Sequence, residues 1–121
     1  MVLRYAKAPT QRQLRVGEEI RHALADMFIR NELSHPFFEK IMISISEVRV
    51  GPDLKVATAF LVMPDDIDHK ALLKLFKDIS PTIRKIVGKK VLLRYTPELR
   101  FAADESVKYA ARIESLLKSV K

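Results

Sequence analysis

Residues 72–88 have the sequence LLKLFKDISPTIRKIVG, and this stretch decides the fold. Up to residue 79 its apolar side chains recur at helical spacing, with Leu72 and Phe76 on one stripe. Ser80-Pro81 then interrupts the pattern. Serine is a good N-cap and proline is favoured at the first helical position, so a second helix is predicted to begin there and to end near Gly88. The stretch therefore predicts a helix, a kink and another helix.

A hairpin is predicted to precede this helical stretch. Isoleucines at 41, 43 and 45 share one parity and Val48 and Val50 share the other, which indicates a β-bulge near Ser46-Glu47 in a strand over residues 40–50. Gly51-Pro52-Asp53 supplies a turn, and residues 54–62 alternate as an antiparallel second strand. Residues 64–68 (PDDID) are predicted to open the next helix, where carboxylates suit the positive end of the macrodipole. We favour that interpretation over a metal site, because the spacing of a calcium-binding loop is missing.

The two ends of the chain complete the order αββααβ plus a C-terminal helix. Thr10 and Gln13 fit a capping box for a first helix, which Ser34-His35-Pro36 is predicted to end. Residues 91–101 alternate around Pro97, so that proline indicates an edge position, a bulge or a break between two short strands. A final helix is expected from Asp104. We expect residues 1–9 to be a flexible lead-in and residues 10–121 to form a single domain.

Composition limits the class of function. The 121 residues carry a net charge of +7 and include no cysteine, which excludes disulfides, zinc ribbons and thiol chemistry. The three histidines, His22, His35 and His69, lie in unrelated contexts, and the three glycines form no nucleotide-binding loop. No segment is typical of a secretory signal or a membrane span, so a cytoplasmic protein is expected. We therefore expect no enzyme, no cofactor, no metal, no membrane partner and no small-molecule substrate.

The basic residues indicate a polyanionic partner. Between residues 70 and 100 the only acids are Asp78 and Glu98, and a second basic group, with Arg4 and Lys7, lies on the lead-in and the first helix. A nearly single-signed run suits phosphate binding, because cations that neutralise phosphates release condensed counterions, although a solvated face is the alternative. Tyr95, beside Arg94, is kept as a further contact. The cations predicted to bind nucleic acid are Arg12, Arg15, Lys77, Arg84, Lys85, Lys89, Lys90, Arg94 and Arg100.

Three motifs resemble the ribosome-binding factor A family. They are residues 15–21 (RVGEEIR), residues 46–54 (SEVRVGPDL) and residues 94–101 (RYTPELRF), the last followed by Asp104-Glu105-Ser106. The resemblance extends over residues 12–118. It implies an α+β fold of the type-II KH-like kind, with helices on one face of a three-stranded sheet. In the family a kink, usually Ala-x-Gly, replaces the GxxG loop of ordinary KH domains, and here Ile79-Ser80-Pro81 occupies that place.

The same resemblance implies a function. Members of the family bind the immature bacterial small (30S) ribosomal subunit, contact its ribosomal RNA (rRNA) and assist late rRNA processing, notably in the cold, without catalysis. We expect this chain to do so as a monomer, with RNA as the ligand of the basic residues. Two alternatives stay open: a general KH-type module for single-stranded nucleic acid, and a scaffold that binds proteins.

Overall fold

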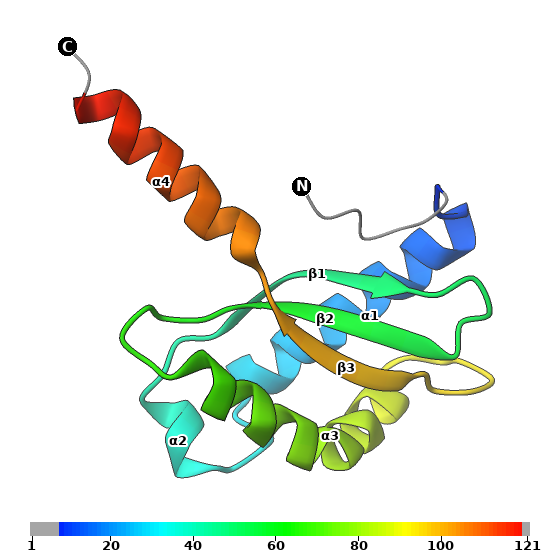
Figure 1. Ribbon diagram of the computed structural model, residues 1–121. Helices are drawn as coiled ribbons and strands as arrows, with labels where there is room; N and C mark the ends of the chain where they lie inside the picture. The colour runs from blue at the N-terminus through cyan, green and yellow to red at the C-terminus, as the bar shows by residue number, and fades with distance from the viewer. Residues whose placement is uncertain (1–7, 120–121) are drawn as a thin grey trace.

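A three-stranded sheet organises the fold of this chain. The computed structural model describes residues 8–119, so most of the predicted lead-in, with Arg4 and Lys7, lies outside the described residues. Figure 1 shows the elements in order. They are α1 (Gln11–Ile29), α2 (Pro36–Glu39), β1 (Ser44–Val50), β2 (Val56–Val62), α3 (His69–Lys90), β3 (Glu98–Ala103) and α4 (Glu105–Ser119).

The strands lie in the order β1-β2-β3, with β1 antiparallel and β3 parallel to the central strand. The register between β1 and β2 shifts between Ile45 and Glu47, which confirms the predicted bulge. Val56 of β2 is paired with Glu98 of β3, so the turn that precedes β2 lies beside the loop that precedes β3. That neighbourhood matters for the candidate site.

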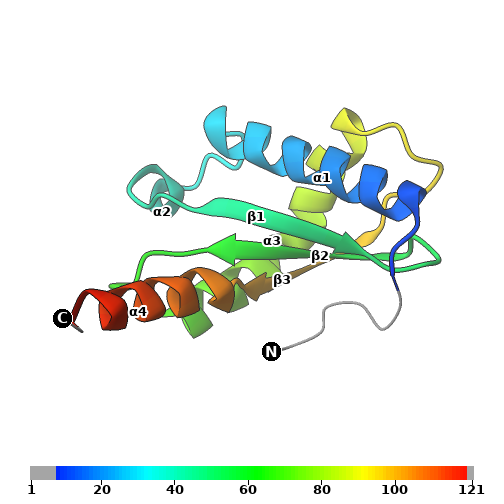
Figure 2. The same cartoon turned by 90° about the horizontal axis from the view of Figure 1, so that it is seen from above.

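Helices α1 and α3 pack on the same face of the sheet and form one hydrophobic core with it (Figures 1 and 2). Ile20 and Leu24 of α1 are fully buried there, as is Phe76 of α3. At Gly17 an added Cβ would lie 2.6 Å from the carbonyl oxygen of Val48, so only glycine lets α1 approach β1 this closely. The α+β, type-II KH-like fold implied by the resemblance is confirmed.

The start of α1 follows the prediction and its end does not. Gln13 N–H donates to Thr10 Oγ1 at 3.1 Å and Thr10 N–H donates to Gln13 Oε1 at 2.8 Å, which confirms the capping box. The helix ends at Ile29, earlier than the proline at 36 suggested. Pro36 instead opens the short helix α2, which was not predicted, with His35 Nδ1 accepting from Phe37 N–H.

The two helices predicted around Ser80-Pro81 are one helix, so that prediction was wrong. α3 is assigned without a break from His69 to Lys90, with Pro81 inside it, and its axis bends between the two halves (Figure 1). Proline lacks an N–H and its ring clashes with the carbonyl four residues earlier, which bends a helix without necessarily ending it. The helix also passes Gly88, which is not its cap.

The acidic residues at 65–68 precede α3 and do not form its first turn, contrary to the prediction. Asp68 is the N-cap, and its Oδ1 accepts from Lys70 N–H at 3.0 Å and Ala71 N–H at 3.2 Å. Between α3 and β3, residues 91–97 form a loop. Pro97 therefore does not separate two short strands, because only the strand after it exists, and that strand is at the edge of the sheet. α4 then continues from β3 and extends away from the sheet (Figure 1).

Candidate nucleic-acid interface

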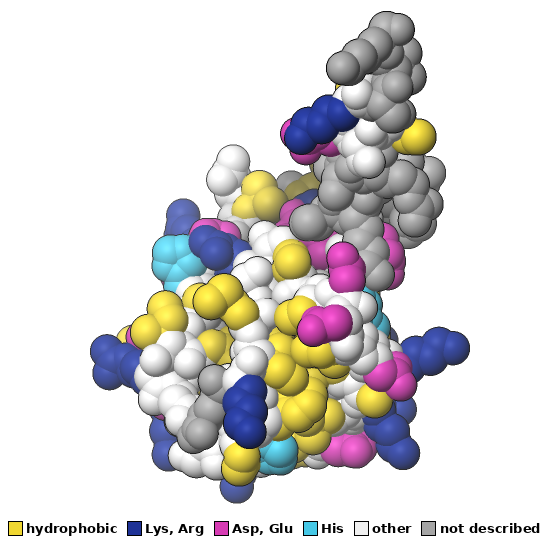
Figure 3. All heavy atoms as spheres, turned by 90° about the vertical axis from the view of Figure 1, so that its left-hand side faces the viewer, with side chains coloured by type: hydrophobic (Ala, Val, Ile, Leu, Met, Phe, Trp, Pro, Cys, Tyr) yellow, Lys and Arg dark blue, Asp and Glu magenta, His cyan; other side chains and the backbone are white. Residues whose placement is uncertain are grey.

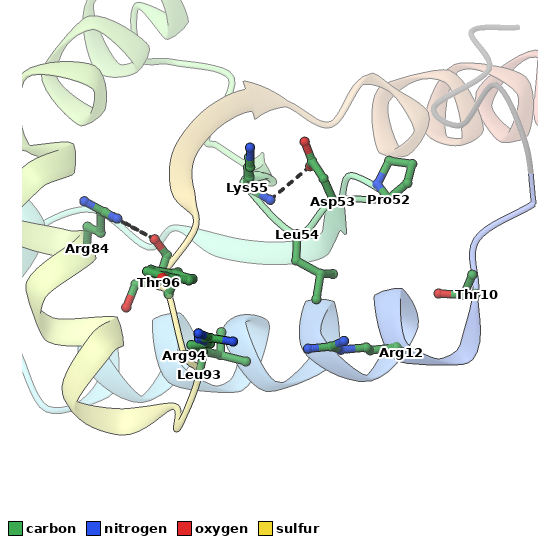
Figure 4. A pocket seen from close by; sticks show the side chains of 11 residues that line it. Thr10, Arg12, Pro52, Asp53, Leu54, Lys55, Arg84, Leu93, Arg94 and Thr96 are labelled. Atoms are coloured by element: carbon green, nitrogen blue, oxygen red, sulfur yellow. Dashed lines mark hydrogen bonds between the residues drawn. The ribbon is translucent and has the colours of Figure 1, made fainter.

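A pocket at one end of the domain, here called the cationic pocket, gathers basic side chains from four segments (Figure 4). These are the start of α1, the β1–β2 turn, the second half of α3 and the 91–97 loop. Its volume is about 600 Å³. Arg12, Lys55, Arg84 and Arg94 line it, and Asp53 is the acidic residue of the lining.

The sheet topology explains why these segments meet. Glu98 N–H donates to the carbonyl oxygen of Lys55 at 2.8 Å, which joins the β1–β2 turn to the end of the 91–97 loop. On the other side, the buried amide of Gln13 donates to the carbonyl oxygen of Val50 at 2.9 Å and fixes the start of α1 against the end of β1. Arg12 is therefore positioned by a hydrogen bond that its neighbour makes.

Arg84 has a structural role in the cationic pocket besides its charge. Its Nε donates to the carbonyl oxygens of Thr96 at 3.0 Å and Pro97 at 3.2 Å, and its Nη2 donates to that of Thr96 at 2.5 Å. A hydrogen bond from a charged donor to a carbonyl oxygen is stronger than one from a neutral donor. The guanidinium therefore fixes the loop that carries Arg94 and Tyr95.

Tyr95 is the exposed aromatic residue of the pocket. The residue is 75% exposed, and Cζ of Arg94 lies 5.7 Å from the ring centroid. That distance is within the range of a cation–π interaction. Among the side chains that the structure describes, none of the acidic ones is an ion-pair partner of Arg12, Lys55 or Arg94. Their charges are available to an anion that enters the pocket.

The other predicted cations lie outside the pocket. Arg15, Lys77, Lys85 and Lys89 are exposed on α1 and α3. Arg100 is exposed on β3, where its Nη2 lies 3.5 Å from Glu98 Oε2. Of the kink residues, Ile79 and Ser80 are half-buried and Pro81 is exposed, and none of the three lines the pocket.

Lys90 already has partners within the chain. Its Nζ lies 2.6 Å from Asp26 Oδ2 and 2.5 Å from Glu32 Oε1. The hydrogen bonds with Asp26 and then Glu32 raise the pKa of Lys90, and the same bond with Lys90, followed by that with Arg30, lowers the pKa of Asp26. Asp26, Arg30, Glu32 and Lys90 form what we call the ion-pair junction, which ties the end of α3 to the end of α1. A paired lysine adds little to phosphate binding.

Sequence reasoning missed Lys55 and the loop-holding role of Arg84. Lys55 is alone among its sequence neighbours, since the next basic residue along the chain is Lys70. Only the parallel pairing of β2 with β3 brings it beside residues 94–98. Once the parallel pairing of β2 with β3 is known, a basic residue in the turn before the central strand can be recognised as a candidate for the site.

The histidines have local partners. His22 Nε2 lies 2.9 Å from Glu18 Oε1, and His69 Nε2 lies 2.8 Å from the carbonyl oxygen of Pro64. Among the histidine and acidic side chains that the structure describes, no three lie close enough to hold a metal ion together. Over the same span, no helix has the length and hydropathy of a membrane span.

The opposite end of the molecule has a different surface. Figure 3, the view onto the left-hand side of Figure 1, shows hydrophobic side chains exposed together in the middle of that face. Met42, between α2 and β1, is 88% exposed, and Phe37 and Phe38 of α2 are only half-buried. The two ends of the domain therefore differ, with the cationic pocket at one and exposed hydrophobic side chains at the other.

Comparison with known proteins identifies the family. The family description of ribosome-binding factor A matches residues 12–117. A ribosome-binding factor A from Pelagibacter ubique is 42% identical over 118 residues, which cover 98% of this chain and 97% of that protein. The chain belongs to the ribosome-binding factor A family.

Solved structures of the family share the fold. The crystal structure of ribosome-binding factor A from Thermus thermophilus has a TM-score of 0.62 and 17% identity, over 75% of this chain and 94% of that one. A homology model of the Thermus thermophilus factor, fitted into the cryo-EM map of a 30S complex, has a TM-score of 0.58 and 17% identity, over 74% of this chain and 91% of that one. At this identity the likeness shows the fold alone.

Proposed function

We propose that this chain binds the small ribosomal subunit through its rRNA and assists late maturation of that subunit without catalysing a reaction. Membership of the family supports the proposal, as does the placement of the Thermus thermophilus relative in a map of a 30S complex. The observation that carries it is the cationic pocket, where Arg12, Lys55 and Arg94 converge from three segments without ion-pair partners in the described chain. A protein with this partner works in the cytoplasm and needs no cofactor.

The proposed interface has two parts. The cationic pocket supplies a concave site, and Lys77, Lys85 and Lys89 along the exposed side of α3 extend the positive surface beyond it. Contacts to phosphates fix position and orientation and carry no sequence information by themselves. The long cation-bearing surface therefore recognises the shape of folded rRNA, and the exposed Arg15 of α1 and Arg100 of β3 are proposed as further contacts.

Co-sedimentation with purified small subunits tests the proposal. We expect the wild-type chain to sediment with subunits and the Lys85→Glu/Lys89→Glu/Arg94→Glu variant to remain in the supernatant. A Lys40→Glu/Lys70→Glu/Lys118→Glu variant is the matched control, because it changes net charge equally at exposed residues away from the pocket. Undiminished sedimentation of the first variant would overturn the assigned face, and failure of the wild type to sediment would overturn the function.

Maturation is tested in cells of the source bacterium that lack the chain. We expect them to accumulate precursor rRNA of the small subunit, more so in the cold, and expect the wild-type gene to restore processing. The charge-reversed triple variant should not. Normal rRNA processing in the deletion strain would leave subunit binding standing and remove the role in maturation.

A general module for single-stranded nucleic acid is the second candidate, favoured by the openness of Tyr95 beside a row of cations. Fluorescence anisotropy separates the two, because a ribosome factor should bind free oligonucleotides far more weakly than purified small subunits. Equal affinities would favour the general module.

A further inference from the structure

We propose that the cationic pocket binds one unpaired nucleotide of the RNA partner, with its phosphate held by Arg12 and Arg94 and its base stacked on Tyr95. This inference rests on the proposed function and names the ligand of the site. It separates the pocket from the exposed lysines of α3, which would contact the RNA backbone alone.

The size and charge of the pocket fit a nucleotide. A volume of about 600 Å³ is within the range of pockets that hold small molecules, roughly 300–1,000 Å³. Arg12 and Arg94 approach from separate segments, and Figure 4 shows both side chains on the α1 side of the pocket, with Lys55 across from them. Guanidinium groups suit phosphate because their planar donors can form two parallel hydrogen bonds.

The pocket also has a surface for a base. Tyr95 is 75% exposed, whereas all six phenylalanines are buried or half-buried, and Arg94 lies over its ring with Cζ 5.7 Å from the centroid. Leu54 and Leu93 are half-buried in the lining and give it an apolar wall. Arg84 holds the carbonyls of Thr96 and Pro97, so the ring belongs to a fixed loop and loses little freedom when a base stacks on it.

These features distinguish an unpaired nucleotide from a duplex. A duplex presents phosphates and sugars on its surface and keeps its base faces stacked inside, so it cannot use an aromatic ring in a hollow. Splayed-out bases of loops, bulges and strand ends can stack on such a ring. A site that combines cations, an apolar wall and an exposed tyrosine therefore favours single-stranded RNA.

The kink region is a poorer place for the same contact. α3 continues through Ile79 and Ser80, whose backbone is helical, and Pro81 has no N–H to offer a phosphate. A nucleotide grip made by backbone amides needs an open loop, and the structure has a helix there. The 91–97 loop supplies the open segment that the bend in α3 does not.

A tryptophan reporter tests the stacking directly. The chain has no tryptophan, so Tyr95→Trp introduces a single one at the proposed stacking position. We expect saturable quenching of its fluorescence by a single-stranded RNA decamer. The same decamer in a duplex, or with abasic sugars that keep the phosphates, should quench little. Leu92→Trp is the matched control, because Leu92 is 99% exposed in the same loop and does not line the pocket.

Subunit binding provides the second measurement. Tyr95→Ala should weaken co-sedimentation with small subunits by roughly 5- to 150-fold, the range for loss of one stacked base, and Tyr95→Phe should bind more tightly than Tyr95→Ala. Thermal melts should show that both variants fold. Unchanged affinity of Tyr95→Ala, or equal quenching by abasic and intact RNA, would overturn the nucleotide pocket. If Tyr95→Ala bound normally while the Lys85→Glu/Lys89→Glu/Arg94→Glu variant lost binding, the proposed function would stand without the nucleotide pocket. A wild-type chain that binds no subunits would contradict the proposed function itself.

Discussion

The cationic pocket and the ion-pair junction contain the same residue types and use them in opposite ways. At the junction, Lys90 Nζ is within 2.6 Å of carboxylate oxygens of both Asp26 and Glu32, and these ion pairs join α1 to α3. In the pocket, Arg12 and Arg94 face a hollow and have no carboxylate partner among the described side chains. Both regions draw a cation from the second half of α3. Pairing, which only the tertiary structure reveals, decides which positive charges can bind RNA.

Gly17→Ala should have the largest effect, because it disturbs both regions at once. The new Cβ would meet the Val48 carbonyl oxygen at 2.6 Å and push α1 away from β1. That movement displaces Arg12 from the pocket and Asp26 from Lys90. We expect a loss of about 1–3 kcal/mol in unfolding free energy, measured by urea denaturation, together with weaker subunit binding.

Gly51→Ala is the control for that variant. A Cβ at Gly51 would have its nearest contact at 3.5 Å, and the residue does not have a positive φ, so little should change. If Gly17→Ala were as stable as Gly51→Ala, the close approach of α1 to β1 would not be what positions the two regions.

Arg84→Ala should affect the pocket alone. Loss of the hydrogen bonds to Thr96 and Pro97 should lower stability by about 1 kcal/mol, since these bonds are partly exposed, and should speed amide exchange in residues 91–97. Subunit binding should fall further than removal of one charge explains. Arg84→Lys keeps the charge without the paired donors, so full recovery of binding by the lysine variant would show that charge alone matters.

Lys90→Ala should do the reverse, lowering stability modestly while leaving subunit binding near that of the wild type. The contribution of the junction should shrink in high salt, because exposed ion pairs are screened. The pKa of Lys90 is raised on folding, so its contribution is complete below the ordinary value of 10.5 and is lost as pH rises through the raised one. Asp26 has a lowered pKa, so its contribution is present above 3.8 and is lost as pH falls. Thermal melts across this pH range would check the loss of stability at both its acidic and its basic end. If Lys90→Ala weakened subunit binding as much as Arg94→Ala does, the contrast between the two regions would be removed.

Glu18→Gln should have the smallest effect. The hydrogen bond from Arg21, aided by that from His22, lowers the pKa of Glu18 from 4.5 to about 2. Its stabilisation is therefore fully present above pH 4.5 and is lost as pH falls towards 2. Since the side chain is exposed, we expect only a slight difference between wild type and Glu18→Gln at neutral pH, and that difference should vanish in acid. A stability difference between wild type and Glu18→Gln that grew as pH fell would contradict the expected direction of the pH dependence.

Local chemistry made some features predictable and not others. The capping box at Thr10 and the bulge near Ser46 depend on residues close in sequence, and both were found from it. The uninterrupted α3 was missed because Pro81 favours a helix start, whereas the core contacts of Phe76 before it and Ile83 after it keep one helix continuous. Residues 91–95 alternate like a strand but form a loop, because their backbone has no neighbouring strand to pair with.

The candidate site was predictable only in part. Arg12, Arg84 and Arg94 were predicted from charge, and the structure brings all three to one pocket. The pairing of Lys90 with Asp26 spans 64 residues of sequence, and the arrival of Lys55 depends on a parallel strand pair. Neither of these contacts produces a periodic or local pattern in the sequence. Charge patterns therefore predict the class of partner, and tertiary contacts select the residues.

The central claim is that the unpaired cations of the pocket, and not the paired ones of the junction, bind rRNA phosphates. The salt dependence of small-subunit binding tests it most directly, because each phosphate contact on single-stranded RNA adds about 0.7 to the slope of log affinity against log salt concentration. We expect Arg12→Ala/Arg94→Ala to have a slope shallower by about 0.7, for the one phosphate that the two arginines hold together, and Lys90→Ala to keep the wild-type slope. An unchanged slope for the double variant would contradict the account.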